Sequence, residues 1–289
     1  MKRILLALFL LASPGAFAQF DIGRALDLGK KVMQAQEGMK DLTEEEEIAL
    51  GEQLTAGFLG ASPLHADANM QRYVNRVGKW LAMHSGRPDL PWTFAVIDTE
   101  TINAFAMPGG DVIVSSGLLK RLSSESELAG VLSHEIAHVV KKHQLQAIQS
   151  AAKGDLMSSI GKEFAGDAIA RRGGGALTQA GKTALANVAT DLLKDGFFLR
   201  PLDRSMEYEA DKLGVVIAAR SGYDPYGLVG VLEMLAQTKS DGSGLSVLDT
   251  HPAPADRLAQ LEPFMPLVER DVSQPREVQE RFRKIVGAP

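Results

Sequence analysis

The sequence contains no cysteine among its 289 residues. This absence excludes disulfide bonds, and it also excludes thiolate ligands for a metal ion. A metal site in this chain must therefore use histidine and carboxylate side chains. Such a ligand set favours zinc among the common divalent ions.

The chain also lacks an excess of positive charge and lacks a long apolar run after its first residues. Its formal net charge is −5, which argues against a nucleic-acid-binding surface. Beyond residue 18, no apolar run approaches the roughly 20 residues that a membrane-spanning helix needs. We therefore expect no nucleic-acid partner and no transmembrane span in the mature chain.

Residues 1–18 have the organisation of a signal peptide. Lys2 and Arg3 are basic, residues 4–12 are apolar, and residues 16–18 read Ala-Phe-Ala, a small-x-small cleavage site. The alternative, a membrane anchor, is disfavoured because the apolar run is short. We expect the mature chain to begin at Gln19 and to be exported.

The rest of the chain is predicted to form an α+β, predominantly helical domain over residues 43–270, after an N-terminal segment at 19–42. Helices are expected from Thr43, over 67–84, 202–220 and 225–237, and from Pro254 to Leu261. Strands are expected at 91–98, 103–106 and 111–115, in a small antiparallel sheet. The acidic run 44–47 is predicted to be a solvated first helical turn.

Two segments give weaker signals. Residues 150–182 are rich in Gly, Ala and Ser, and we interpret them as a flexible insertion. The insertion is either a lid over the active-site cleft or a disordered loop. Residues 271–289 form a polar and charged tail, with a final surface helix as one option.

Residues 134–138 read His-Glu-Ile-Ala-His and carry the chemistry. Residues four apart on a helix share a face, so His134 and His138 can bind one metal ion. Glu135 would take a proton from the metal-bound water. The alternative is an ordinary helix with two partly buried histidines. A capping box at Ser124 and Glu127, followed by apolar residues at helical spacing, places both histidines in the middle of a helix.

A catalytic zinc site needs a third protein ligand. Glu207 and Asp211 are four residues apart on a predicted second helix, so Glu207 could bind the ion. Asp211 could then accept a proton from the far nitrogen of a ligand histidine and orient its ring. Glu209 is predicted to be solvated. If the first helix continues, His143 points away from the histidine pair, and we expect it at the surface.

The chain resembles the zinc metallopeptidases that include the HtpX-like proteases, the CAAX prenyl proteases and the exported β-barrel assembly-enhancing proteases. Four stretches carry the resemblance: residues 103–110 (NAFAMPGG), 125–143 (ESELAGVLSHEIAHVVKKH), 207–211 (EYEAD) and 251–257 (HPAPADR). The resemblance implies a zincin-like domain with one Zn²⁺ per chain, in the gluzincin arrangement. His134, His138 and Glu207 would then be ligands and Glu135 the base. The resemblance is nearest to the exported members. Some of these carry a C-terminal tetratricopeptide array, which we do not expect in this chain.

By this resemblance we expect peptide-bond hydrolysis by a zinc-dependent endopeptidase. His251 and Arg257 are candidate donors to the oxyanion. His251 could instead bind zinc in a resting state, or be an ordinary loop residue before a proline. An edge strand is expected to bind extended substrate by strand addition, through Asn103, Ala104, Phe105 and Ala106.

The expected substrates are misfolded or unassembled periplasmic and outer-membrane proteins, so the expected role is quality control of the envelope. The outer-membrane assembly machinery is a candidate partner. We expect the protein in the periplasm, with peripheral membrane association left open. Two alternatives remain at this point: a latent, chaperone-like zinc-binding protein that cleaves little, and a metal-dependent hydrolase of a non-peptide bond.

Overall fold

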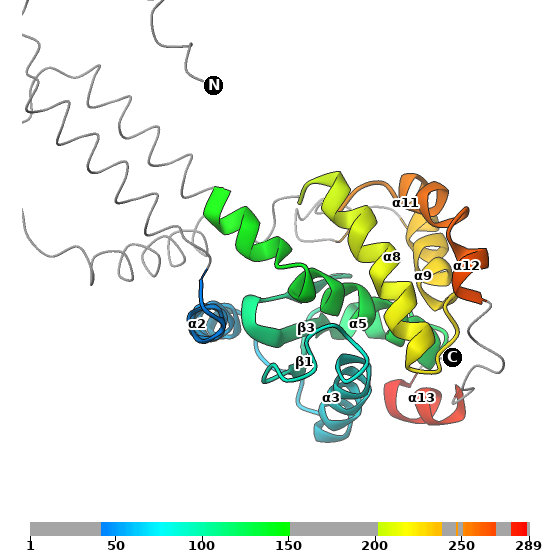
Figure 1. The fold of residues 1–289 in the computed structure, drawn as a ribbon. Coiled ribbons are helices and arrows are strands. Elements are labelled where there is room, and N and C mark those ends of the chain that lie inside the picture. The colour runs from blue at the N-terminus through cyan, green and yellow to red at the C-terminus, as the bar shows by residue number, and fades with distance from the viewer. Residues whose placement is uncertain (1–41, 151–201, 239–246, 248–250, 270–278, 288–289) are drawn as a thin grey trace, which may run out of the picture. The chain divides into compact units, whose positions relative to one another are not determined.

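The computed structural model describes residues 42–150, 202–238, 247, 251–269 and 279–287. The predictions for the signal peptide, for residues 19–41 and for nearly all of the 150–182 insertion lie outside these residues. Among the described helices, none is long and apolar enough to cross a membrane. The elements, shown in Figure 1, are α2 (Glu44–Ala61), α3 (Ala68–Ala82), β1 (Thr93–Ile97), β2 (Ala104–Ala106), η1 (Pro108–Gly110), β3 (Asp111–Ser115), α4 (Ser116–Leu119), α5 (Glu125–Val140), α8 (Arg204–Arg220), α9 (Gly227–Gln237), α11 (Pro254–Leu261), α12 (Met265–Glu269) and α13 (Gln279–Val286).

The predicted α+β class, predominantly helical, is confirmed, but the sheet is mixed and not wholly antiparallel. Its strand order is β1-β3-β2. β2 pairs antiparallel with β3, because the short η1 turn joins them as a hairpin. β1 pairs parallel with β3, with Thr93 opposite Asp111. After β1 the chain passes the position of β3 and forms β2 on the far side of the sheet. It then turns back to form β3 between the two, so β3 runs antiparallel to β2 and in the same direction as β1.

α5 is the central helix of the domain. The Ser124 hydroxyl accepts a hydrogen bond from the Glu127 backbone N–H and so begins the helix. From Leu128 to Val139 every residue of α5 is buried. A helix buried all round must be covered on all sides, and α5 packs against α3, β2, α8 and α9 (Figure 1). The His-Glu-Ile-Ala-His motif therefore lies in the core.

Gly214 allows α8 to approach α5 closely. A Cβ atom at this position would lie 3.0 Å from the His134 backbone nitrogen. Because Gly214 has no side chain, the α8 backbone can lie against the first histidine of the motif. Glu207 and Asp211, about two turns and one turn earlier on α8, are then brought to the same part of α5.

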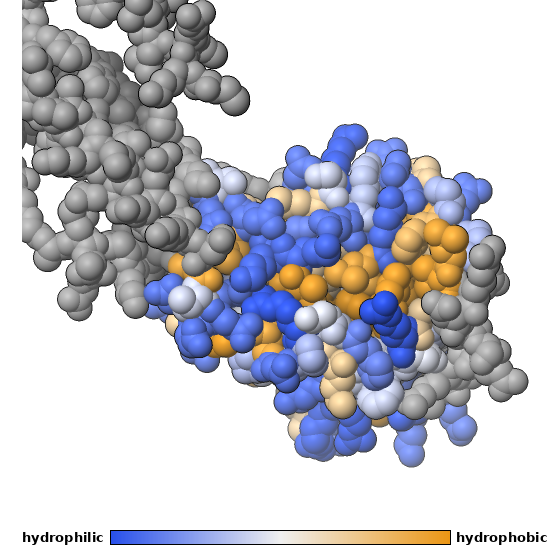
Figure 2. All heavy atoms as spheres, in the orientation of Figure 1, coloured by the Kyte–Doolittle hydropathy of each residue, from blue (hydrophilic) through white to orange (hydrophobic). Residues whose placement is uncertain are grey.

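The C-terminal helix α13 is anchored in the core and is not simply a surface helix. Phe282 is fully buried, and its ring centroid lies 6.5 Å from that of Tyr73 on α3. The neighbouring Arg281 and Lys284 are exposed. Figure 2 shows the outer surface of one face, where polar residues predominate and apolar side chains gather in a band toward α12.

Candidate metal centre

His134 and His138 lie on one face of α5, as their spacing predicts. Their Nε2 atoms are 3.0 Å apart, and both side chains are buried. Burial lowers the pKa of both imidazoles, that of His138 well below its ordinary value. Neutral imidazole is the form that binds a metal ion.

Glu207 reaches this pair from α8. Its Oε2 lies 3.7 Å from His134 Nε2, and its Oε1 lies 3.6 Å from His138 Nε2. The side chain is fully buried, and neither carboxylate oxygen has a hydrogen-bond partner among the described residues. Such an arrangement costs free energy unless a proton or a cation compensates the carboxylate. Burial accordingly raises the pKa of Glu207 to about 8.

His251, from the loop before α11, completes a group of four. Its Nε2 lies 3.7 Å from Glu207 Oε2. One ligand atom from each of His134, His138, Glu207 and His251 lies within 4.8 Å of the others. Zinc binds imidazole nitrogen and carboxylate oxygen at about 2.0–2.2 Å, so the spacing of the four atoms is close to what one shared ion requires. The donor set and the two unpaired oxygens of Glu207 fit a zinc ion.

Asp211 lies one turn after Glu207 and contacts the outer ring nitrogen of His134. Its Oδ1 is 2.9 Å from His134 Nδ1. Arg257 binds the same carboxylate, with Nε 2.9 Å from Oδ2. Burial alone raises the pKa of Asp211, but the Arg257 guanidinium and the His134 hydrogen bond outweigh it and hold this pKa below its ordinary value. Asp211 is therefore ionised and can orient His134.

Glu135 is buried beside the histidine pair. Burial raises its pKa to about 8, although the Arg257 guanidinium acts in the opposite direction. A carboxylate with a pKa this close to neutrality can both accept and return a proton at physiological pH. This is the property that a general base in a hydrolase requires.

The prediction that His143 is a surface residue is wrong. Its side chain is buried, and its Nδ1 lies 3.1 Å from His138 Nδ1. The prediction assumed a continuous helix, but α5 ends at Val140 and Lys142 adopts a left-handed backbone with φ 57°. The Lys142 ammonium group lies 3.0 Å from the Glu47 carboxylate. Glu47 is itself buried, so the prediction that the acidic run 44–47 is solvated is wrong at this residue. The chain turns at Lys142 and folds His143 back onto His138.

Glu209 extends this contact to the surface. His143 Nε2 lies 3.2 Å from Glu209 Oε2, and the Lys141 ammonium lies 2.6 Å from Oε1. Glu209 is partly solvated, as predicted, with 48% of its side chain exposed. It is nevertheless part of a chain of contacts that runs from the surface to His138. A break in a helix without glycine or proline gives little sequence signal, so the sequence did not predict this series of contacts.

The segment predicted to bind substrate is at an edge of the sheet. β2 ends the strand order, and Asn103 comes immediately before it. The Asn103 side chain is buried, and its Oδ1 accepts a hydrogen bond from the Ala104 backbone N–H. Phe105 lies against Phe58, with ring centroids 4.8 Å apart. Strand addition at this edge would therefore use the β2 backbone and not the Asn103 side chain.

The fold and the site together define an HExxH-type metal hydrolase, in which one helix supplies two histidines and a base and a second helix supplies a carboxylate. The sequence profile described as Peptidase family M48 matches residues 68–264. The chain belongs to this family of metallopeptidases.

Similar proteins carry peptidase names. The chain is 31% identical to the "Beta-barrel assembly-enhancing protease" of Escherichia coli (strain K12) over 215 residues. The matched region covers 74% of this chain and 42% of that protein. The chain is 32% identical to the "Mitochondrial metalloendopeptidase OMA1" of Schizosaccharomyces pombe, over 67% of this chain and 52% of the relative. The chain thus spans less than half the length of the E. coli protein.

Proposed function

We propose that this chain is a zinc-dependent endopeptidase. The observation that carries the proposal is Glu207, whose two buried oxygens lack hydrogen-bond partners among the described residues and face His134 and His138. His134, His138 and Glu207 would hold the ion. When bound, zinc supplies Lewis-acid chemistry, which lowers the pKa of water and polarises a carbonyl group.

Glu135 is proposed as the general base and acid. Its carboxylate accepts a proton from the attacking water and then gives it to the leaving amine nitrogen. Burial raises its pKa to about 8 without an ion, and the charge of a bound cation would lower this pKa toward the range in which the carboxylate accepts a proton. Asp211 acts through His134, because its contact with Nδ1 holds the ring with Nε2 toward Glu207.

His251 is proposed to bind the ion in a resting state. Its place in the group of four supports this role. A catalytic zinc site usually has three protein ligands and one open position, and His251 would fill that position in the resting state. The earlier alternative, oxyanion stabilisation, applies once His251 has moved from the ion. Arg257 has less support as an oxyanion donor, since its Nε and Nη2 contact Asp211. Unchanged zinc affinity and unchanged activity in His251→Ala would exclude both roles of His251.

The proposed substrates are misfolded or unassembled proteins of the bacterial periplasm and outer membrane. Three features support this: the signal-peptide pattern of residues 1–18, the name of the E. coli relative, and β2 at the sheet edge. Strand addition uses main-chain hydrogen bonds and tolerates varied sequences, which suits unfolded substrates. The outer-membrane assembly machinery is the proposed partner, and peripheral attachment to a membrane is compatible with this location.

Cleavage of casein by the purified chain tests the proposal. We expect cleavage that stops with a chelator and returns with zinc. Glu135→Gln should retain stoichiometric zinc and lose about 10²–10⁴-fold in rate. Cleavage that survives both the chelator and the Glu135→Gln substitution would exclude a zinc protease.

A latent zinc-binding protein is the second candidate, and one observation favours it. Four protein ligands would leave no open position on the ion, and His251 makes a fourth available. In that case the wild-type chain would bind zinc and cleave little, and His251→Ala would increase cleavage. A chaperone-like protein without peptidase chemistry would bind unfolded protein and show no cleavage in either form.

A further inference from the structure

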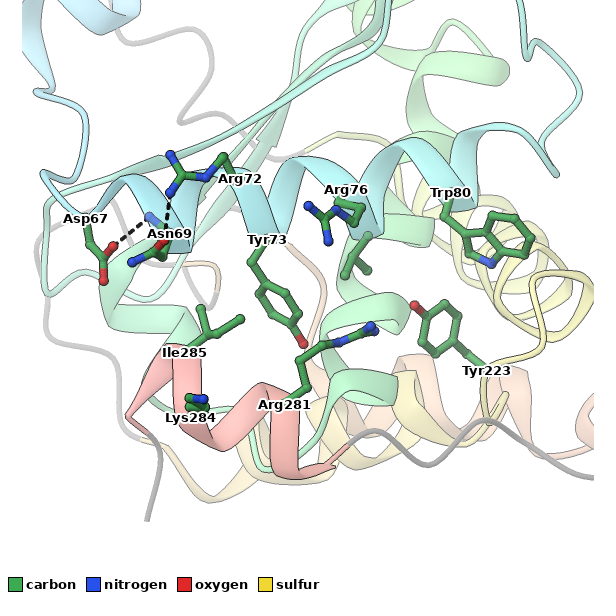
Figure 3. Close-up of a pocket in the computed structure, with 11 residues that line it drawn as sticks. Asp67, Asn69, Arg72, Tyr73, Arg76, Trp80, Tyr223, Arg281, Lys284 and Ile285 are labelled. Carbon is green, nitrogen blue, oxygen red and sulfur yellow. Dashed lines mark hydrogen bonds between the residues drawn. The ribbon is translucent and has the colours of Figure 1, made fainter.

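A cavity of about 640 Å³ lies between α3 and α13, away from the metal centre. None of the residues that line it belongs to the four-residue metal group. Figure 3 shows α3 along one side of this cavity and α13 along the other, with Tyr223 at one end. Nothing in the hydrolytic chemistry proposed above uses this cavity.

The lining of the cavity is strongly cationic. It contains four basic side chains and one acidic side chain, Asp67. The Asp67 carboxylate caps α3, where it accepts hydrogen bonds from the backbone N–H groups of residues 69 and 70. The basic residues form two short rows that face each other, one on α3 and one on α13: Arg72, Arg76, Arg281 and Lys284.

Most of this positive charge is not neutralised within the described part of the chain. Arg281 is paired with the buried Glu125 carboxylate. Arg72 donates only to the neutral side-chain oxygen of Asn69. Arg76 and Lys284 form no ion pair with any described residue. Figure 3 shows Arg76 on α3 and Arg281 on α13 at opposite sides of the cavity. Of these two, Arg281 alone has a carboxylate partner among the described residues.

One end of the cavity is aromatic. Trp80 and Tyr223 lie there, and Tyr73 lies nearer the middle (Figure 3). The polar atoms of these rings are held by the protein: Trp80 Nε1 donates to the Ser221 carbonyl oxygen, and the Tyr73 and Tyr223 hydroxyls donate to the Glu125 carboxylate. The rings also have neighbours, because Trp80 lies against His84 and the Arg281 guanidinium lies over the Tyr73 ring. What this end adds to the cavity lining is mainly apolar carbon surface.

We propose that this cavity binds an acidic segment of another polypeptide in extended conformation, with an apolar or aromatic residue at the Trp80 end. The segment from the cap Asp67 to Trp80 in α3 runs along the cavity, and about 14 residues at the helical rise span about 20 Å. About six residues of an extended chain cover that length, whereas one phosphate ion does not.

The spacing of the charges supports an extended peptide. Arg72 and Arg76 are one turn apart, which is a rise of about 6 Å along α3. Alternate side chains of a strand lie on the same side about 6.6 Å apart. Carboxylates at alternate positions can therefore pair with successive arginines, and Arg281 and Lys284 can meet them from the opposite side.

This proposal goes beyond the proposed peptidase function and does not depend on a metal ion. A segment held in the cavity would tether a substrate or partner chain to the domain without occupying the metal centre. Binding must then persist in a chelator and in Glu135→Gln, so failure of this proposal and failure of the peptidase proposal are separate results.

Fluorescence anisotropy with labelled peptides tests the proposal on the full-length chain carrying Glu135→Gln, in chelator. The probes are two seven-residue peptides with Glu at alternate positions, one with Phe at its N-terminus and one with Phe at its C-terminus. The same two peptides with Gln in place of Glu are the comparison. We expect the better Glu peptide to bind at least about tenfold more tightly than its Gln counterpart. The double variant Arg72→Gln/Arg76→Gln should weaken its binding about tenfold.

The matched control is Lys79→Gln/Arg283→Gln, which removes the same charge from exposed positions of the same two helices outside the cavity lining. Binding should change less than about twofold in this control. Equal losses in both double variants, or equal affinity for Glu and Gln peptides, would overturn the proposal. Vesicles of phosphatidylcholine with phosphatidylglycerol form a second arm. If Arg72→Gln/Arg76→Gln loses vesicle binding alone, a phosphate-bearing membrane surface is the ligand, and the peptide proposal is wrong.

Discussion

The two histidines of the HEIAH motif are supported from opposite sides by very different groups. His134 contacts Asp211 directly, and Asp211 is fully buried and bound by Arg257. His138 contacts His143, which contacts Glu209, and 48% of the Glu209 side chain is exposed. Both arrangements can fix the orientation of an imidazole ring. The first uses a charge pair in the core, whereas the second ends in solvent.

The arginine on the Asp211 side also explains two opposite pKa shifts on α8. Glu207 and Asp211 are one turn apart and both are buried. Arg257 bonds to Asp211 but approaches Glu207 only to 4.0 Å. The pKa of Asp211 therefore falls, while burial raises that of Glu207 to about 8. One carboxylate is kept charged by the protein, and the other is left for an ion.

Removal of the buried carboxylate should have the largest effect. Asp211→Ala leaves the Arg257 guanidinium buried without its main partner, which typically costs about 3–5 kcal/mol. We expect a loss of this size in the free energy of unfolding, measured by urea denaturation, together with weaker zinc binding. The exposed Asp256→Ala on α11 is the control and should change stability by less than about 0.5 kcal/mol. If Asp211→Ala costs no more than this control, the pair with Arg257 does not anchor the site.

Removal of the histidine on the other side should act mainly on the metal. In His143→Ala, His138 loses the partner of its outer nitrogen. We expect zinc affinity to fall about ten- to a hundredfold, measured by competition with a fluorescent chelator. His143→Gln, which can still hydrogen-bond, should recover part of the affinity. The control is His84→Ala, whose ring lies tilted against that of Trp80 and outside the four-residue metal group. Loss of stability in His143→Ala with unchanged zinc affinity would reduce His143 to a packing residue.

Glu207, between the two supports, should make zinc binding pH-dependent. Its pKa of about 8 means that zinc must displace a proton at lower pH. The histidines of the site have pKa values below the ordinary value of about 6.5, so they are already neutral above it. Zinc affinity should rise about tenfold per pH unit from about 6.5 to 8 and then level off. In Glu207→Gln the affinity should be weaker and this rise should disappear. The same slope in both proteins would assign the displaced proton to another group.

The two supports also differ in how well the sequence predicts them. His134, His138, Glu207 and Asp211 lie on uninterrupted helices, where residues four apart must share a face. The shared face of each pair follows from spacing once the helices are recognised. The meeting of the two pairs was implied by the family resemblance and depends on how α8 packs on α5 at Gly214. His143 follows a left-handed lysine that is held by a buried glutamate from α2. That contact joins residues 95 positions apart in sequence, so no local pattern reveals it.

The same reasoning separates the rest of the fold into predictable and unpredictable parts. The α11 boundaries at Pro254 and Leu261 are those of the sequence pattern, because proline at the start of a helix is a local signal. The parallel pairing of β1 with β3 depends on which side of β3 the chain enters. The place of Arg257 against Asp211 depends on how α11 packs on α8. Both are properties of the packed core and not of any segment.

The smallest effect is expected at the solvent end of the His138 support. Glu209→Gln keeps an oxygen that can accept a hydrogen bond from His143 but removes the charge. Because Glu209 is half-exposed and also pairs with Lys141, screening reduces the value of that charge. Zinc affinity should fall only about two- to threefold, and the difference should vanish in 1 M salt. Glu209→Ala should cost more than Glu209→Gln but less than His143→Ala, because His143 remains in contact with His138. A loss in Glu209→Gln as large as that in His143→Ala would show that this side depends on a fixed charge as well, and the contrast with Asp211 would then be wrong.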